Sequence, residues 1–317
     1  MGNEPPASRG PLASSPKPLL DQELAERVAS LRVRASHAVD GIHSGIHKSP
    51  HRGASVIFAE HRDYRPGDDL RMLDWRAFAR NDRYTIKHFE QETHLRANLL
   101  LDLSASMAFD GGRPATQKAH YAATLLAAFA WILLGQGDAV GAFAFDADLR
   151  KALPARNRPD HLDALLSVLA LPVVRDRAAA RTNLSATLTA LGERVGRRGL
   201  VVLASDLLDT APEALAPLSQ LAALGHEIIV VQVLHAQELD FPFKHSLQFE
   251  DSEGPDSLEA DADAVRAAYR AELGAFLQNC KQRCQSAGAR YALARTDQPV
   301  EDVIVSVLMS GRRGGWG

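Results

Sequence analysis

A carboxylate and two hydroxyls occupy every second position of the segment DLSAS at 102–106. Alternate residues of an extended segment point to the same side, so Asp102, Ser104 and Ser106 can converge on one point. Carboxylate and hydroxyl oxygens are hard ligands, which Mg²⁺ prefers in a near-octahedral arrangement. The spacing therefore indicates a site for a small divalent cation, but so short a pattern needs support from the rest of the chain.

Two further oxygen-bearing side chains occur at the boundaries of later elements. Thr182 stands just before a predicted helix at 183–195, and Asp206 follows an apolar run at 200–204. In open α/β sheets, ligands bind at the carboxyl ends of strands, beside a switch in strand order. Three loops at such places, each with a hard oxygen ligand, favour one shared metal site. The candidate residues of this site are Asp102, Ser104, Ser106, Thr182 and Asp206.

Each of these residues also has a simpler structural explanation. Thr182, or Asn183 beside it, could serve only as the N-cap of the following helix. Ser104 could cap the turn that follows it, and Asp206 could accept hydrogen bonds from loop amides. The sequence alone leaves these explanations open for each residue. Separate structural roles explain less well why all three loops carry an oxygen ligand at the end of a strand or the start of a helix.

The elements that must position these residues alternate between strands and helices from residue 98 onward. Apolar runs predict buried strands, and apolar side chains at helical spacing predict the helices between them. This alternation is typical of an α/β fold with a doubly wound, mostly parallel sheet. The expected strands are 98–102, 139–145, 149–153, 200–204, 227–234 and 290–294, and the expected helices are 116–134, 159–169, 183–195, 212–223, 262–286 and 300–309.

The first third of the chain has a different character. Residues 1–20 are rich in proline, serine and glycine, which predicts a disordered leader. Residues 21–96 combine a helix at 21–39 with short strands and turns, and we expect them to form a small α+β appendage. The main domain is expected at 97–310. Within it, 237–263 is a polar insertion that becomes strongly acidic toward its end.

Composition narrows the function classes. The 317 residues are 46% hydrophobic and 24% charged, which is ordinary for a globular protein, and the net charge of -3 gives no case for nucleic-acid or anionic-membrane binding. No apolar run reaches the about 18 residues that a membrane span needs, and the N-terminus does not resemble a signal peptide. We expect a cytoplasmic protein without a membrane span.

Histidine and cysteine residues give weaker signals. His43 and His47 have helical i, i+4 spacing, but Gly41 and Gly45 disfavour a helix there, so a loop with incidental histidines is expected at 41–53. Cys280 and Cys284 also have i, i+4 spacing, within a predicted helix. Two thiols alone make neither a zinc site nor a disulfide framework.

Several longer stretches resemble a known bacterial family. FAEHRDYRPGDD at 58–69, LDWR at 73–76 and FEQE at 89–92 are similar to the signature of domain of unknown function 58. FPF at 241–243 and TDQP at 296–299 are also similar to that family. The metal-site residues resemble the metal-ion-dependent adhesion site of von Willebrand factor type A domains. This resemblance implies a von Willebrand factor A-like, Rossmann-type fold.

The resemblance also implies roles for the site residues. Ser104 and Ser106 would bind Mg²⁺ or Mn²⁺ directly, Thr182 directly or through water, and Asp102 and Asp206 mainly through water. Such a site leaves a position open for a carboxylate from a partner protein. Members of the family are commonly encoded beside MoxR-type AAA+ ATPases, so the resemblance implies a non-catalytic adaptor that works with such an ATPase, or with its client, in assembly or maturation of a protein complex.

Two other functions remain open on the sequence. The same cation could assist hydrolysis as a Lewis acid, with Asp206 or Glu60 as the general base, although no nucleophile-elbow or phosphate-loop motif occurs. The protein could also be a scaffold that uses no metal. The segment at 60–92 carries charges of both signs in nearly equal number. We interpret it as an ion-paired surface or domain seam, with partner recognition by the appendage as the alternative.

Overall fold

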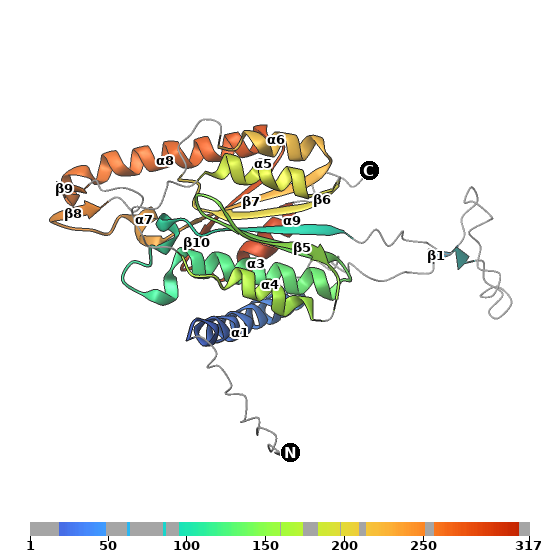
Figure 1. Ribbon diagram of the computed structural model, residues 1–317. Coiled ribbons are helices and arrows are strands. Elements are labelled where there is room, and N and C mark those ends of the chain that lie inside the picture. Colours follow the sequence, from blue (N-terminus) through green and yellow to red (C-terminus); the bar gives the residue numbers. More distant parts are fainter. Residues whose placement is uncertain are drawn as a thin grey trace, which may run out of the picture.

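The computed structural model describes residues 19–48, 62–63, 85–86, 95–158, 160–173, 183–196, 198–208, 214–250 and 257–310. Its centre is a six-stranded sheet with the strand order β10-β7-β6-β3-β4-β5 (Figure 1). The strands are β3 (Arg96–Asp102), β4 (Ala139–Phe145), β5 (Leu149–Arg156), β6 (Gly199–Ser205), β7 (His226–Leu234) and β10 (Arg290–Arg295).

The strand order confirms the predicted fold class. Numbered by their occurrence in the chain, the strands of this sheet lie in the order 6-5-4-1-2-3, which is the doubly wound arrangement of Rossmann-type folds. Adjacent strands are parallel except for β5, which pairs antiparallel with β4 at one edge. The order reverses between β3 and β6, so the topological switch point lies between these two strands.

Helices cover both faces of the sheet (Figure 1). One face carries α1 (Leu19–Lys48), α3 (Lys118–Gly135), α4 (His161–Leu169) and α9 (Val300–Ser310). The opposite face carries α5 (Leu184–Arg194), α6 (Ala216–Ala223) and α8 (Ala262–Ser286). Side chains of a strand alternate between faces, so Leu99 and Leu101 of β3 pack in the core with α3, while Leu100 packs in the core with α5.

The helix α3 is the inner helix of its face. In the described part of the chain it alone is long and apolar enough to cross a membrane, by length and composition, but 72% of that stretch is buried inside the protein. A helix that is apolar on all sides needs a partner on all sides. Here the sheet, α1, α4 and α9 supply those partners. Lys118, at the start of α3, is the charged residue in this apolar helix, and its side chain is also buried.

The prediction of a loop at 41–53 is wrong for its first part, because α1 continues to Lys48. Tertiary packing outweighs the low helix propensity of glycine here. Val39 and Ile42 belong to the same core as α3 and α9. Gly41 has a steric role, because a Cβ at this position would lie only 3.0 Å from Oε1 of Glu301 on α9. The glycine therefore lets α1 and α9 approach closely.

Other expected regions are described in part. The expected polar insertion at 237–263 overlaps α7 (Ala236–Asp240) and holds an antiparallel hairpin of β8 (Ser246–Glu250) and β9 (Ser257–Asp261), which leads directly into α8. Of the appendage, the structure describes α1 and the antiparallel pair β1 (Arg62–Asp63) and β2 (Thr85–Ile86). Most of the leader and of the charged segment at 60–92 lies outside the described residues, and the division into domains stays a prediction.

Candidate functional site

The carboxylates of Asp102 and Asp206 lie at the switch point of the sheet. Asp102 is the last residue of β3, and Asp206 directly follows β6. The two strands are paired in parallel up to Leu101 and Ala204, which brings their carboxyl ends to the same edge. Asp102 is 2% exposed and Asp206 is 1% exposed. Two acidic side chains are thus buried where ligands bind in folds of this type.

Hydrogen bonds hold the Asp102 carboxylate from the loop after β3 and from the end of β6. Its Oδ1 accepts from the backbone N–H of Ser104 at 2.9 Å, and its Oδ2 accepts from the hydroxyl of Ser205 at 2.6 Å. Burial, followed by the negative charge of Asp206, raises the pKa of Asp102 to about 7, although the bonds from Ser205 and Ser104 oppose this shift. Desolvation and a like charge both disfavour an ionised carboxyl, and the positive charge of a bound cation would offset both effects.

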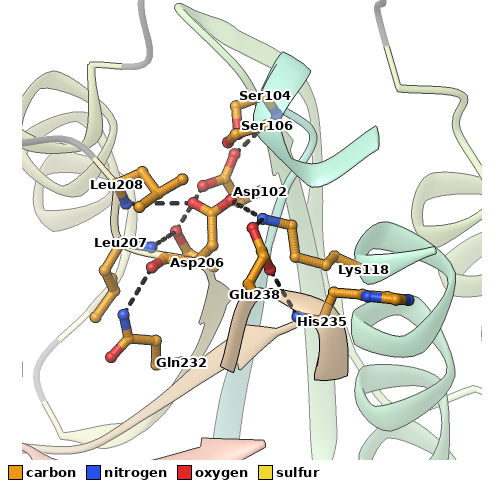
Figure 2. Close-up of polar contacts among 11 residues, drawn as sticks. Asp102, Ser104, Ser106, Lys118, Asp206, Leu207, Leu208, Gln232, His235 and Glu238 are labelled. Carbon is orange, nitrogen blue, oxygen red and sulfur yellow. Dashed lines mark hydrogen bonds and ion pairs between the residues drawn. The ribbon is translucent and has the colours of Figure 1, made fainter. Parts of the chain in front are cut away.

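The hydroxyls of Ser104 and Ser106 face each other at 3.1 Å, beside Asp102 (Figure 2). Both side chains are buried. Ser104 precedes the 3-10 turn η2 (Ala105–Ala108), but its side chain makes no capping hydrogen bond to that turn. The simpler explanation of Ser104 as a cap is therefore wrong. The pair instead places two oxygen atoms next to a buried carboxylate.

The loop that carries Asp206 is held by several bonds. Asp206 Oδ1 accepts from the backbone N–H of Leu208 at 3.2 Å, as the loop-amide explanation expects. The side-chain amide of Gln232 donates to the carbonyl of Asp206 at 2.8 Å. Leu207 has a positive φ of 59°, a conformation that L residues rarely adopt and that is concentrated at functional loops. The Asp206 loop is thus both fixed and strained.

Thr182 lies outside the described residues, so its place in the site stays a prediction. Its neighbour Asn183 is the N-cap of α5, and its side chain accepts from the backbone N–H of Ala186 at 2.9 Å. Of the two capping explanations for this loop, the one that assigns the cap to Asn183 is confirmed. Glu60, the other candidate general base, also lies outside the described part of the chain.

A lysine outside the set of residues predicted from the sequence completes the cluster. Lys118 is 0% exposed, and its Nζ lies 2.9 Å from Asp206 Oδ2 and 2.8 Å from Glu238 Oε1 (Figure 2). Burial disfavours its ammonium, but the charges of Asp206 and Glu238 outweigh burial and raise the pKa of Lys118. The one signal in the sequence was a lysine at the start of an otherwise apolar helix.

The helix α7 positions Glu238 beside Lys118. α7 follows β7, and Glu238 forms a capping box at its first turn, where Oε2 accepts from the backbone N–H of His235 at 2.7 Å. The His235 ring in turn lies 3.1 Å from the hydroxyl of Thr116 and packs edge-on against Phe109. His235 therefore connects the loop between β3 and α3 to the start of α7. Glu238 connects α7 to Lys118 and so to the carboxylate cluster.

The donor chemistry of this cluster fits a hard divalent cation. Its oxygen atoms come from carboxylates and hydroxyls, which suit Mg²⁺ or Mn²⁺. Within the described residues, Asp102, Asp206 and Glu238 carry three carboxylates and Lys118 one ammonium, which leaves negative charge to balance. In the described part of the chain, no group of three or more His, Cys, Asp or Glu side chains is placed to hold a metal ion. A cation here would therefore depend on the serine hydroxyls.

Comparisons with known proteins give one family match. Residues 60–275 match the family described as protein of unknown function DUF58. The uncharacterized protein Rv1480 of Mycobacterium tuberculosis is 28% identical over 320 residues, which cover 97% of each chain.

Solved structures give more distant similarities. An aerotolerance-related membrane protein from Bacteroides fragilis has a TM-score of 0.45 at 16% identity, covering 69% of this chain and 99% of that chain. The VWA domain of SpRpn10 has a TM-score of 0.39 at 10% identity, covering 67% of this chain and 94% of that chain.

Proposed function

The chain belongs to the DUF58 family, and we propose that it is a non-catalytic protein-binding module that captures a carboxylate of a partner through a divalent cation. The observation that carries this proposal is the convergence of Asp102 and Asp206 at the switch point, with the paired hydroxyls of Ser104 and Ser106 beside them. In folds of this type, ligands bind at the carboxyl ends of the strands. Buried carboxylates and hydroxyls at that place favour a cation-dependent site.

Each residue has a proposed role toward Mg²⁺ or Mn²⁺. Ser104 and Ser106 supply direct oxygen ligands, and Thr182 binds the cation directly or through water. Asp102 and Asp206 balance the charge of the cation and hold it through water. When bound, the cation supplies a positive centre that still accepts an anionic oxygen, because its direct protein ligands are mostly neutral.

The partner is proposed to be a protein that offers an acidic side chain. The family resemblance supports a MoxR-type AAA+ ATPase, or the client complex of that ATPase, in assembly or maturation. The cytoplasm is the proposed location, as expected from the sequence pattern of the chain. The net charge of -3 gives no support to nucleic acid as the ligand.

Metal-assisted hydrolysis is the less favoured function for this site. A general base must be free to take a proton from water. Asp206 is engaged by Lys118 and Leu208, and both oxygens of Asp102 accept hydrogen bonds. These contacts favour anchoring over proton transfer. Turnover of p-nitrophenyl phosphate or p-nitrophenyl acetate with MgCl₂, lost in Ser104→Ala, would favour the hydrolase instead.

Capture of the MoxR-type ATPase of the same organism tests the proposed function. The immobilised full chain is expected to retain the ATPase in MgCl₂ and to release it in EDTA. Ser104→Ala should reduce retention in MgCl₂ at least ten-fold, while the exposed Ser219→Ala on α6 should retain it as the wild type does. Equal retention by the wild type in MgCl₂ and in EDTA would support a metal-independent scaffold and contradict the proposal.

A further inference from the structure

Lys118 connects three separate elements at the candidate site. It lies in the first turn of α3, and its ammonium reaches Asp206 after β6 and Glu238 on α7. Its side chain is wholly buried, whereas the Glu238 side chain is 22% exposed. Figure 2 shows the ammonium between the two carboxylates, on the side of Asp206 that faces α3. A positive charge is thus already resident at the carboxylate that would help to hold a metal ion.

We propose that Lys118 is a resident cation that competes with the divalent metal for Asp206 and so sets the metal affinity of the site. This inference rests on the proposed function, because it concerns the same cation. Two positive centres that share one buried carboxylate repel each other, and the low dielectric of a protein interior strengthens that repulsion. An ammonium on Asp206 therefore weakens metal binding, although it also satisfies the carboxylate when no metal is present.

Glu238 gives Lys118 a second carboxylate. Its Oε1 accepts from Lys118, while its Oε2 is held by the capping box of α7. Because both contacts exist together, Lys118 keeps one ionic partner if a metal draws Asp206 away. Glu238 thereby lowers the free-energy cost of replacing the ammonium by a metal ion at Asp206. Lys118 and Glu238 are expected to act on metal affinity in opposite directions.

A purely structural ion pair makes a different prediction. Lys118 could simply tie α3 to the ends of β6 and α7, and breaking a buried pair is then destabilising through the charge left uncompensated. Such a role lowers stability on mutation but does not tighten metal binding. The sign of the change in Mg²⁺ affinity therefore separates the two roles.

Calorimetric titration of the full chain with MgCl₂ at pH 8 tests the assignment. Lys118→Met keeps the unbranched shape and most of the length of the side chain and removes its charge, and it is expected to bind Mg²⁺ at least ten-fold more tightly than the wild type. The matched control is Lys281→Met, which removes the same charge from an exposed position on α8. The control should bind Mg²⁺ within two-fold of the wild type. Addition of Asp206→Asn to Lys118→Met should abolish the gain.

Glu238→Gln provides a second test that leaves the Lys118–Asp206 pair in place. Lys118 then has Asp206 as its remaining charged partner in the cluster, so Mg²⁺ should bind at least three-fold more weakly. The exposed Glu272→Gln on α8 is the matched control and should show no such loss. This variant keeps the inference testable if Lys118→Met does not fold.

The outcomes distinguish this inference from the proposed function. Mg²⁺ binding that is unchanged or weaker in Lys118→Met, or unchanged or tighter in Glu238→Gln, would overturn the role of Lys118 while the metal site itself stands. Absence of Mg²⁺ binding in both the wild type and Lys118→Met would overturn the site and this inference together. Opposite shifts in the two variants, with unchanged controls, would support it.

Discussion

The hydroxyl of Ser205, at the end of β6, donates to Asp102 Oδ2, at the end of β3, over 2.6 Å. The bond crosses the point where the strand order reverses. The same hydroxyl accepts from the backbone N–H of Leu207 at 3.0 Å, so it also shapes the loop that carries Asp206. One side chain thus couples the two carboxylates of the candidate site.

Ser205→Ala is expected to lower the free energy of unfolding by about 2 kcal/mol, because a buried carboxylate and a buried N–H each lose a partner. Urea denaturation in EDTA measures this change. Ser219→Ala, at an exposed position of α6, serves as the control and should change stability by less than about 0.5 kcal/mol. Equal stability of Ser205→Ala and the wild type would show that the bond does not hold the strand ends.

Gly111 and Gly112 form a matched pair in the loop between β3 and α3. Both have positive φ, of 60° and 81°, but a Cβ on Gly111 would lie 2.3 Å from the His235 ring, whereas a Cβ on Gly112 would meet nothing within 4 Å. Gly112→Ala should cost about 1 kcal/mol from backbone strain. Gly111→Ala should cost about 2 kcal/mol more, because of the added overlap. Equal losses on urea denaturation would mean that this loop is not closely packed against α7.

The thiols of Cys280 and Cys284 are expected to be inert in the folded protein. Both are buried, and burial raises the pKa of Cys284 to about 12 and also raises the pKa of Cys280. Because the thiolate is the reactive form, a thiol-specific reagent such as dithionitrobenzoate at pH 8 should modify the native protein at least 100-fold more slowly than the unfolded chain. Rapid modification of both thiols in the folded protein would contradict their burial in the core between α8 and the sheet.

Much of the fold could be predicted from the sequence, because buried parallel strands consist of apolar runs that are easy to recognise. Strands such as β6 and β7 therefore appear close to where they were expected. The continuation of α1 past residue 39 could not be predicted from propensity, because Ile42 packs in the core with α3 and α9 and Gly41 lies against Glu301 of α9. The hairpin of β8 and β9 was also missed, because its acidic sequence lacks the apolar pattern of a core strand.

The candidate site could be predicted only in part. Asp102, Ser104 and Ser106 are close in sequence, and the strand order accounts for the approach of Asp206. Lys118 and Glu238 are separated by 120 residues, and their contact depends on how α3 and α7 pack at the edge of the sheet. A lysine also does not belong to any metal-ligand pattern. Residues that modify a site through charge are thus harder to find than the residues that would bind its ligand.

Titration of MgCl₂ into the wild type and into the double variant Ser104→Ala/Ser106→Ala tests the central claim most directly. The wild type is expected to bind one Mg²⁺ ion per chain. The double variant should lose that binding by at least ten-fold while its circular dichroism spectrum stays unchanged, because two proposed direct ligands are removed without disturbing the core. Binding of equal strength in both proteins, or none in the wild type at millimolar MgCl₂, would contradict a metal site at the end of β3.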